Sequence, residues 1–128
     1  MGVRRIIPYL QSDDFAAVEA FYGGLLGLES AGMGTAGSGD FVGFSAAENP
    51  SAQIAVSAPG VEDPVPHMGI DVGDPAAVEA AHAEAVRRGL EVVYPLTDEP
   101  WGVRRFFVRE PSGKVVNVAS HIADLDSE

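Results

Sequence analysis

The chain has 128 residues, of which 46% are hydrophobic, and this predicts one soluble domain with its own core. It contains no cysteine, which excludes a disulfide framework, a thiolate zinc site and a cysteine nucleophile. The net charge of −11 argues against nucleic acid, which needs a basic face, and favours a cationic or electron-poor small molecule, although solubility alone would equally explain it.

The N-terminal stretch MGVRRIIPYLQSDD has an apolar run that is too short for a secretory signal or a membrane span. We therefore expect a cytoplasmic protein with no membrane partner. The apolar run itself predicts a β-strand over residues 3–10.

A helix is predicted to follow, with Asp14 as its N-cap. Apolar residues recur at helical spacing and predict one buried stripe, formed by Val18, Phe21, Tyr22 and Leu25. Strand patterns separated by turn-forming clusters come next, over residues 29–33, 41–45 and 53–57.

The second half of the chain repeats this order. The segment DFAAVEA, which starts at Asp14, recurs as DPAAVEA from Asp74, with Pro75 at the first helical position. The expected stripe of this helix consists of Val78, Ala81, Ala85 and Val86. Strands are predicted before it and after it, over residues 65–72, 90–94, 103–108 and 115–120.

Each half thus has the pattern β-α-β-β-β, and one helix cannot cover both faces of a four-stranded sheet. We predict an α+β fold in which two tandem βαβββ modules form a curved mixed sheet around a shared cleft. The boundaries in this single domain are 1–58 for the first module, 59–65 for a linker, 66–121 for the second module and 122–128 for a frayed acidic tail.

The motifs FYGGLLGLE, His67 and PWGVRRFFVREPSGKVVNVASH resemble the vicinal oxygen chelate superfamily. This superfamily includes glyoxalase I, extradiol dioxygenases and bleomycin-type antibiotic-binding proteins. The turn Glu110-Pro111-Ser112-Gly113 stands where members usually carry DPDG, and it should preserve the bend.

The resemblance also implies four positions at which metal-dependent members hold their ligands. In this chain they are Ile7, Ala55, His67 and Asn117. A catalytic divalent site needs three protein ligands, and one imidazole with one amide oxygen does not supply them. We therefore predict no metal, no cofactor and no catalytic residue, and the most similar members are the metal-free antibiotic-binding ones.

Alternation along the strands predicts which neighbours share the cleft face. Tyr9 joins Ile7, Gln53 joins Ala55, and the parity of Trp101 continues through Arg105 and Phe107, although the bulk of Phe106 leaves the opposite register open. Phe41 is preferred to Phe44. The predicted ligand-binding residues are Ile7, Tyr9, Phe41, Gln53, Ala55, His67, Trp101, Arg105, Phe107 and Asn117.

Several of these residues have a structural alternative. Trp101 either stacks on an aromatic ligand or caps the sheet or a dimer seam. His67 either bonds a ligand or is a satisfied structural histidine. We expect His82 and His121 to face solvent, and one of Arg104 and Arg105 only to pair with carboxylates.

The leading hypothesis is a metal-free protein that sequesters an aromatic, hydrophobic antibiotic or natural product and so confers drug self-resistance. The resemblance implies a homodimer, with clefts at or near the interface. The alternative is a glyoxalase-like isomerase, lyase or dioxygenase with an atypical active site, in which His67 with Tyr9 or Asp71 acts as general acid and base.

Overall fold

The computed structural model describes residues 2–31 and 41–122, and the predicted acidic tail beyond Ile122 lies outside them. The chain divides into two compact units: a first unit of residues 6–63, and a second unit of residues 2–5 and 64–122. None of the helices in the described ranges is long and apolar enough to cross a membrane.

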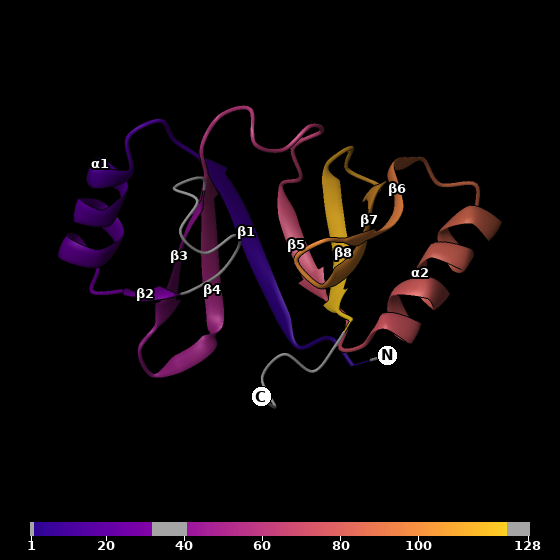
Figure 1. Cartoon of the computed structure of the whole chain (residues 1–128), viewed down its shortest axis with the longest axis horizontal. Coiled ribbons are helices and arrows are strands. Elements are labelled where there is room, and N and C mark those ends of the chain that lie inside the picture. Colours follow the sequence, from indigo (N-terminus) through magenta and orange to yellow (C-terminus); the bar gives the residue numbers. More distant parts are fainter. Residues whose placement is uncertain (1, 32–40, 123–128) are drawn as a thin grey trace. The chain divides into compact units, whose positions relative to one another are not determined.

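The first unit contains a four-stranded sheet and one helical segment (Figure 1). Its strands lie in the order β2-β3-β4-β1, with β1 parallel to β4 and the other pairs antiparallel. The elements are β1 (Arg5–Gln11), α1 (Phe15–Glu19), η1 (Ala20–Leu25), β2 (Glu29–Ala31), β3 (Phe41–Ala46) and β4 (Asn49–Ser57).

The helical segment starts as predicted but ends differently. The side chain of Asp14 accepts a hydrogen bond from the Ala17 amide at 3.0 Å, so it is the N-cap. After one α-helical turn the chain widens into the π-helix η1, in which the Leu26 amide donates to the Phe21 carbonyl at 3.1 Å. The adjacent glycines of FYGGLL weaken the regular helix here.

The wider turn makes part of the predicted stripe wrong. Phe21 is 49% exposed and Leu25 is 69% exposed, whereas Tyr22 is half-buried with its ring 5.7 Å from that of Phe44. A π-helix has more residues per turn than an α-helix, so residues that share a face at α-helical spacing move apart.

The second unit repeats the pattern with a regular helix (Figure 1). Its strands lie in the order β5-β8-β7-β6, with β5 parallel to β8 and the other pairs antiparallel. The elements are β5 (Met68–Asp71), α2 (Pro75–Arg87), β6 (Val92–Glu99), β7 (Val103–Arg109) and β8 (Val115–His121). The predicted α+β class and the β-α-β-β-β order of each half are confirmed. β5 is shorter than predicted, β4 begins four residues earlier, and β6 extends to Glu99 through residues predicted as a turn.

Helix α2 packs on its own sheet through small residues. Asp74 caps it by accepting from the Ala77 amide at 2.8 Å. Val78 is fully buried and Ala85 nearly so, in a core cluster with Val72 and Phe106.

Val86, however, is 58% exposed, so its predicted place in the stripe of α2 is wrong. At 100° per residue it lies about 80° around the helix from Val78. His82 lies only about 40° from Val78 and is half-buried, with its ring edge-on to Phe106 at 5.0 Å, so the expectation that it faces solvent is also wrong.

The turn after β7 keeps the expected bend. The Gly113 amide donates to the Glu110 carbonyl at 2.8 Å, and the Lys114 amide donates to the Glu110 carboxylate at 2.9 Å. The hydroxyl of Ser112 bonds the same carboxylate, and these contacts lower the pKa of Glu110. Glutamate thus holds this turn at the position where the family resemblance implies aspartate.

The N-terminal residues form hydrogen bonds with the end of β5. The Arg4 amide donates to the Asp71 carbonyl at 2.8 Å, and the Arg5 guanidinium bonds the buried Asp71 carboxylate at 2.9 and 3.1 Å. Asp71 also accepts from the Gly73 amide at 3.0 Å. Gly73 has φ +103°, and a Cβ there would lie 2.7 Å from the Gly2 carbonyl oxygen.

We predict that Gly73→Ala lowers the free energy of unfolding by about 3 kcal/mol, because it combines a left-handed backbone with a steric overlap. Gly113→Ala is the control, since it has φ +92° and open space around the Cβ. It should cost about 1 kcal/mol. Urea unfolding followed by circular dichroism measures both, and equal losses would show that the N-terminal residues do not constrain Gly73.

Candidate functional site

The predicted residues of the first unit share one face of their sheet. Tyr9 pairs with Ala55, and Ala55 pairs with Gly43, in adjacent strands. Side chains of directly paired residues point to the same side, and alternation adds the second-neighbour positions. This face therefore carries Ile7, Tyr9, Phe41, Gln53 and Ala55.

Phe44 lies on the other face, where it contacts Tyr22 of the helical segment. The register thus separates Phe41 from Phe44 as the sequence analysis preferred. Phe44 is 1% exposed and belongs to the core between helix and sheet.

In the second unit, the face opposite α2 carries three of the predicted residues. Phe107 pairs with Asn117, and Arg105 pairs with Ala119. Phe106 alternates with them and packs under α2. The sequence leaves two registers open for this strand. The structure has the one that places Arg105 and Phe107 on the face opposite α2, and both residues are buried.

His67 ties two strands together. Its backbone amide donates to the Val115 carbonyl at 2.8 Å, and its Nδ1 accepts from the Val115 amide at 3.3 Å. These two contacts attach the start of β5 to the start of β8. Of the two roles predicted for His67, this geometry supports the structural one over ligand binding.

Arg105 lies among three aromatic rings. Its guanidinium carbon is 5.1 Å from the Tyr94 ring centroid, 5.2 Å from that of Trp101 and 4.9 Å from that of Phe107. All three distances are within the range of cation–π attraction. The Tyr94 and Phe107 rings also contact each other, with centroids 4.8 Å apart.

A carboxylate completes this group. Arg105 Nε donates to Glu99 Oε2 at 2.7 Å, and the Tyr94 hydroxyl donates to the same oxygen at 2.6 Å. The side chains of Arg105 and Glu99 are only 9% and 8% exposed. We call Tyr94, Glu99, Trp101, Arg105 and Phe107 the Arg105 cluster.

Trp101 is the exposed member of the Arg105 cluster. It lies in the turn between β6 and β7, where the Gly102 amide donates to the Glu99 carbonyl at 3.0 Å. The residue is 44% exposed although its ring contacts the buried guanidinium. Its predicted position in a loop is confirmed.

Sequence reasoning missed Tyr94 and Glu99. The pairing of β6 with β7 shifts register on both sides of Tyr94, so alternation along β6 does not tell which side chains reach the face of Arg105. The only available signal was the position of Glu99 at the start of the turn that carries Trp101.

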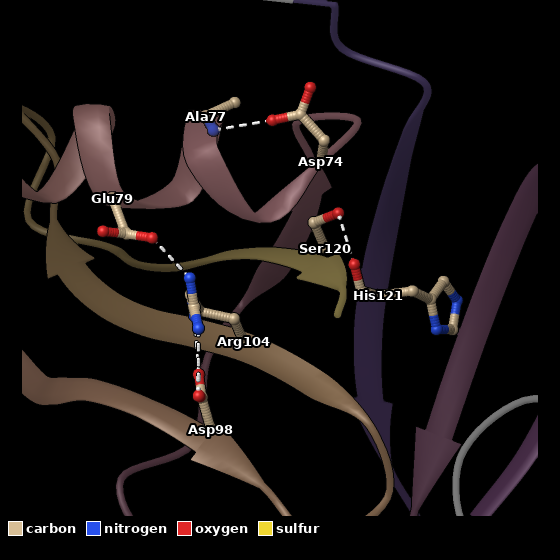
Figure 2. Close-up of polar contacts among 7 residues, drawn as sticks. All are labelled: Asp74, Ala77, Glu79, Asp98, Arg104, Ser120 and His121. Carbon is tan, nitrogen blue, oxygen red and sulfur yellow. Dashed lines mark hydrogen bonds and ion pairs between the residues drawn. The ribbon is translucent and has the colours of Figure 1, made fainter. Parts of the chain in front are cut away.

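The sequence predicts that one of Arg104 and Arg105 only pairs with carboxylates, and Arg104 is that residue (Figure 2). Its Nε and Nη2 donate to Asp98 at 2.6 and 3.0 Å, and its Nη1 bonds Glu79 of α2. This pairing lowers the pKa of Asp98 and raises that of Arg104. Arg104 and Arg105 are neighbours in sequence but lie on opposite faces of the sheet.

The residues at the four positions implied by the family resemblance do not fit a divalent metal. Ile7 and Ala55 have no ligating atom, and His67 Nδ1 is hydrogen-bonded to the backbone. Residues 2–31 and 41–122 contain no group of three or more His, Cys, Asp or Glu that could hold a metal ion. Asp71, considered above as an acid–base partner, is bound by Arg5.

Comparison with protein families assigns the chain to a superfamily. Residues 5–118 match the Glyoxalase/Bleomycin resistance protein/Dioxygenase superfamily, so the chain belongs to it. The finding confirms the resemblance to the vicinal oxygen chelate proteins. A search of curated proteins gave no significant match.

Solved structures share the fold at low sequence identity. Methylmalonyl-CoA epimerase from Mycobacterium tuberculosis has 16% identity and a TM-score of 0.68, over 99% of this chain and 92% of that chain. NAD-dependent benzaldehyde dehydrogenase from Legionella pneumophila has 15% identity and a TM-score of 0.68, over 91% and 98%.

A superfamily member from Vibrio splendidus 12B01 has 13% identity and a TM-score of 0.62, over 91% of this chain and 97% of that chain. At these identities the similarity indicates a common fold alone.

We predict that Asp98→Asn flattens the acid dependence of stability. The lowered pKa of Asp98 means that its stabilisation is present above its ordinary pKa and is lost as the pH falls through the lowered value. Urea unfolding at neutral pH and at about pH 2 should show a smaller difference for the variant than for the wild type. Arg104→Gln removes the cause of the shift and should flatten the dependence similarly; an unchanged difference in both variants would contradict the assignment.

We predict that Arg105→Met lowers the free energy of unfolding by about 3–5 kcal/mol, because it leaves the buried Glu99 carboxylate without its cation. The double substitution Glu99→Gln with Arg105→Gln should recover most of this loss, because the buried pair becomes neutral. Chemical denaturation measures both. If the double variant is no more stable than Arg105→Met, the loss comes from packing instead of charge.

Proposed function

We propose that the protein is a metal-free small-molecule-binding member of its superfamily, which sequesters an aromatic, hydrophobic antibiotic or natural product without changing it. The observation that carries the proposal is the exposed Trp101 indole, held over a buried cation next to two further aromatic rings. A half-exposed, oriented indole is a stacking surface for a planar ligand.

The preorganisation of this surface supports binding. Trp101 contacts Arg105, and Arg105 is fixed by Glu99, Tyr94 and Phe107. A ring that is already held in place loses little conformational freedom when a ligand stacks on it. A sequestering protein needs only such a surface and a few polar anchors.

The residues at the family's metal positions support binding over metal-dependent catalysis. Ile7 and Ala55 lie on one sheet face of the first unit, where both are buried and neither carries a ligating atom. In the second unit, Asn117 shares a face with Phe107. We propose that this face of the second unit contributes to the ligand site in addition to the Arg105 cluster.

The proposal predicts saturable quenching of Trp101 fluorescence by one class of aromatic antibiotic. The chain has one tryptophan, so the signal reports on this position. A panel of planar antibiotics is titrated into the purified protein, and the compound is recovered and analysed by mass spectrometry. Sub-micromolar quenching, corresponding to about −8 kcal/mol or tighter, with intact compound is the expected result.

Trp101→Leu is the matching variant, with binding followed by calorimetry because the fluorophore is lost. It should weaken binding by about fivefold or more, since one stacked ring contributes about 1 kcal/mol. Leu90→Ala, at an exposed apolar residue between α2 and β6, is the control and should bind normally. A chemically altered compound, or a response to divalent metal alone, would favour an enzyme.

The homodimer implied by the family resemblance remains a prediction. Sedimentation velocity of the full chain, with and without a bound antibiotic, measures the oligomeric state directly.

A further inference from the structure

The indole of Trp101 has two different environments. The guanidinium of Arg105 is 5.2 Å from its centroid on one side, and the residue is nevertheless 44% exposed. Any planar ligand that stacks on the exposed surface therefore lies across the indole from a positive charge.

That charge is permanent and fixed. An arginine side chain remains protonated at all accessible pH values. Glu99 Oε2 accepts from Arg105 Nε at 2.7 Å and from the Tyr94 hydroxyl at 2.6 Å, so the carboxylate holds the guanidinium from one edge. The rings of Tyr94 and Phe107 bound it at 5.1 and 4.9 Å. The group that faces the indole is the cation.

A cation on one side of an aromatic ring changes what the other side attracts. The negative quadrupole of the indole is already engaged by Arg105. A second cation would compete for the same electron density and be repelled by the guanidinium. A ring that carries negative charge or electron-donating hydroxyl groups is attracted instead.

The net charge of −11 acts in the opposite direction but at longer range. At physiological ionic strength, exposed charges more than about 8 Å away are largely screened. A charge next to the indole is less screened, because the Arg105 side chain is only 9% exposed. Contact selectivity at Trp101 is therefore governed by Arg105 more than by the overall acidity.

We propose that Arg105 is a specificity-determining residue of the Trp101 site, which makes the site prefer planar aromatic ligands that are anionic or phenolic over cationic ones of the same shape. The inference rests on the proposed function, because it requires that ligands stack on Trp101. It reverses the preference for cationic partners expected from composition alone.

The test compares three ligands of one shape: naphthalenesulfonate, naphthol and trimethyl(naphthyl)ammonium. Calorimetric titration at physiological salt gives the affinity of each for the full chain. We expect the anionic and phenolic compounds to bind about fivefold more tightly than the cationic one, which corresponds to one cation–π contact of about 1 kcal/mol.

The decisive variant is Glu99→Gln with Arg105→Gln, which removes both charges and leaves the net charge unchanged. The matched control is Asp98→Asn with Arg104→Gln, which removes the neighbouring ion pair on the opposite face of the sheet. The preference should disappear in the first variant and persist in the control.

Each outcome separates the inference from the function on which it rests. If the naphthalene compounds and the antibiotic panel all fail to bind, the proposed function is wrong and the inference falls with it. If ligands bind but the cationic compound is equal or preferred, the function stands and the inference is overturned. A preference that survives in the Glu99→Gln, Arg105→Gln variant also overturns the role of Arg105.

Discussion

The buried ion pair between Glu99 and Arg105 is the interaction on which the candidate site depends. Burying two charges costs several kcal/mol per ion unless each is compensated. Here the compensation comes from a 2.7 Å hydrogen bond, from the Tyr94 hydroxyl and from three aromatic rings around the guanidinium. Arg105 also contacts the Trp101 ring, so the contacts that compensate the buried charges also hold the exposed indole in position.

The two units show how one sequence pattern produces different surfaces. Both helices begin with the same capping contact, from Asp14 and from Asp74. Consecutive glycines then allow a π-turn in the first unit, which leaves Phe21 exposed, whereas the alanine-rich α2 stays regular and packs closely on its sheet. A repeated helix start therefore fixes where the helices begin but not which face they bury.

The superfamily scaffold alone does not assign a chemistry, because the same fold carries binding and several reactions. The chain belongs to this superfamily, yet the residues at the ligand positions implied by the resemblance do not fit a divalent metal. The Arg105 cluster, with the exposed Trp101, is the part of the structure on which the proposed binding function rests.

The sequence by itself determined the β-α-β-β-β order, both N-caps, the bend at Glu110–Gly113 and the family, because periodicity, capping and turn chemistry are local properties. Alternation also gave the shared sheet faces of Tyr9 with Ala55 and of Phe107 with Asn117, since regular pairing preserves it. Only the tertiary structure decided that Arg105 lies between three rings and binds Glu99, and that His67 bonds the backbone of Val115. Those contacts join residues from separate strands, and the shifted register of β6 removes the alternation from which Tyr94 and Glu99 could have been inferred.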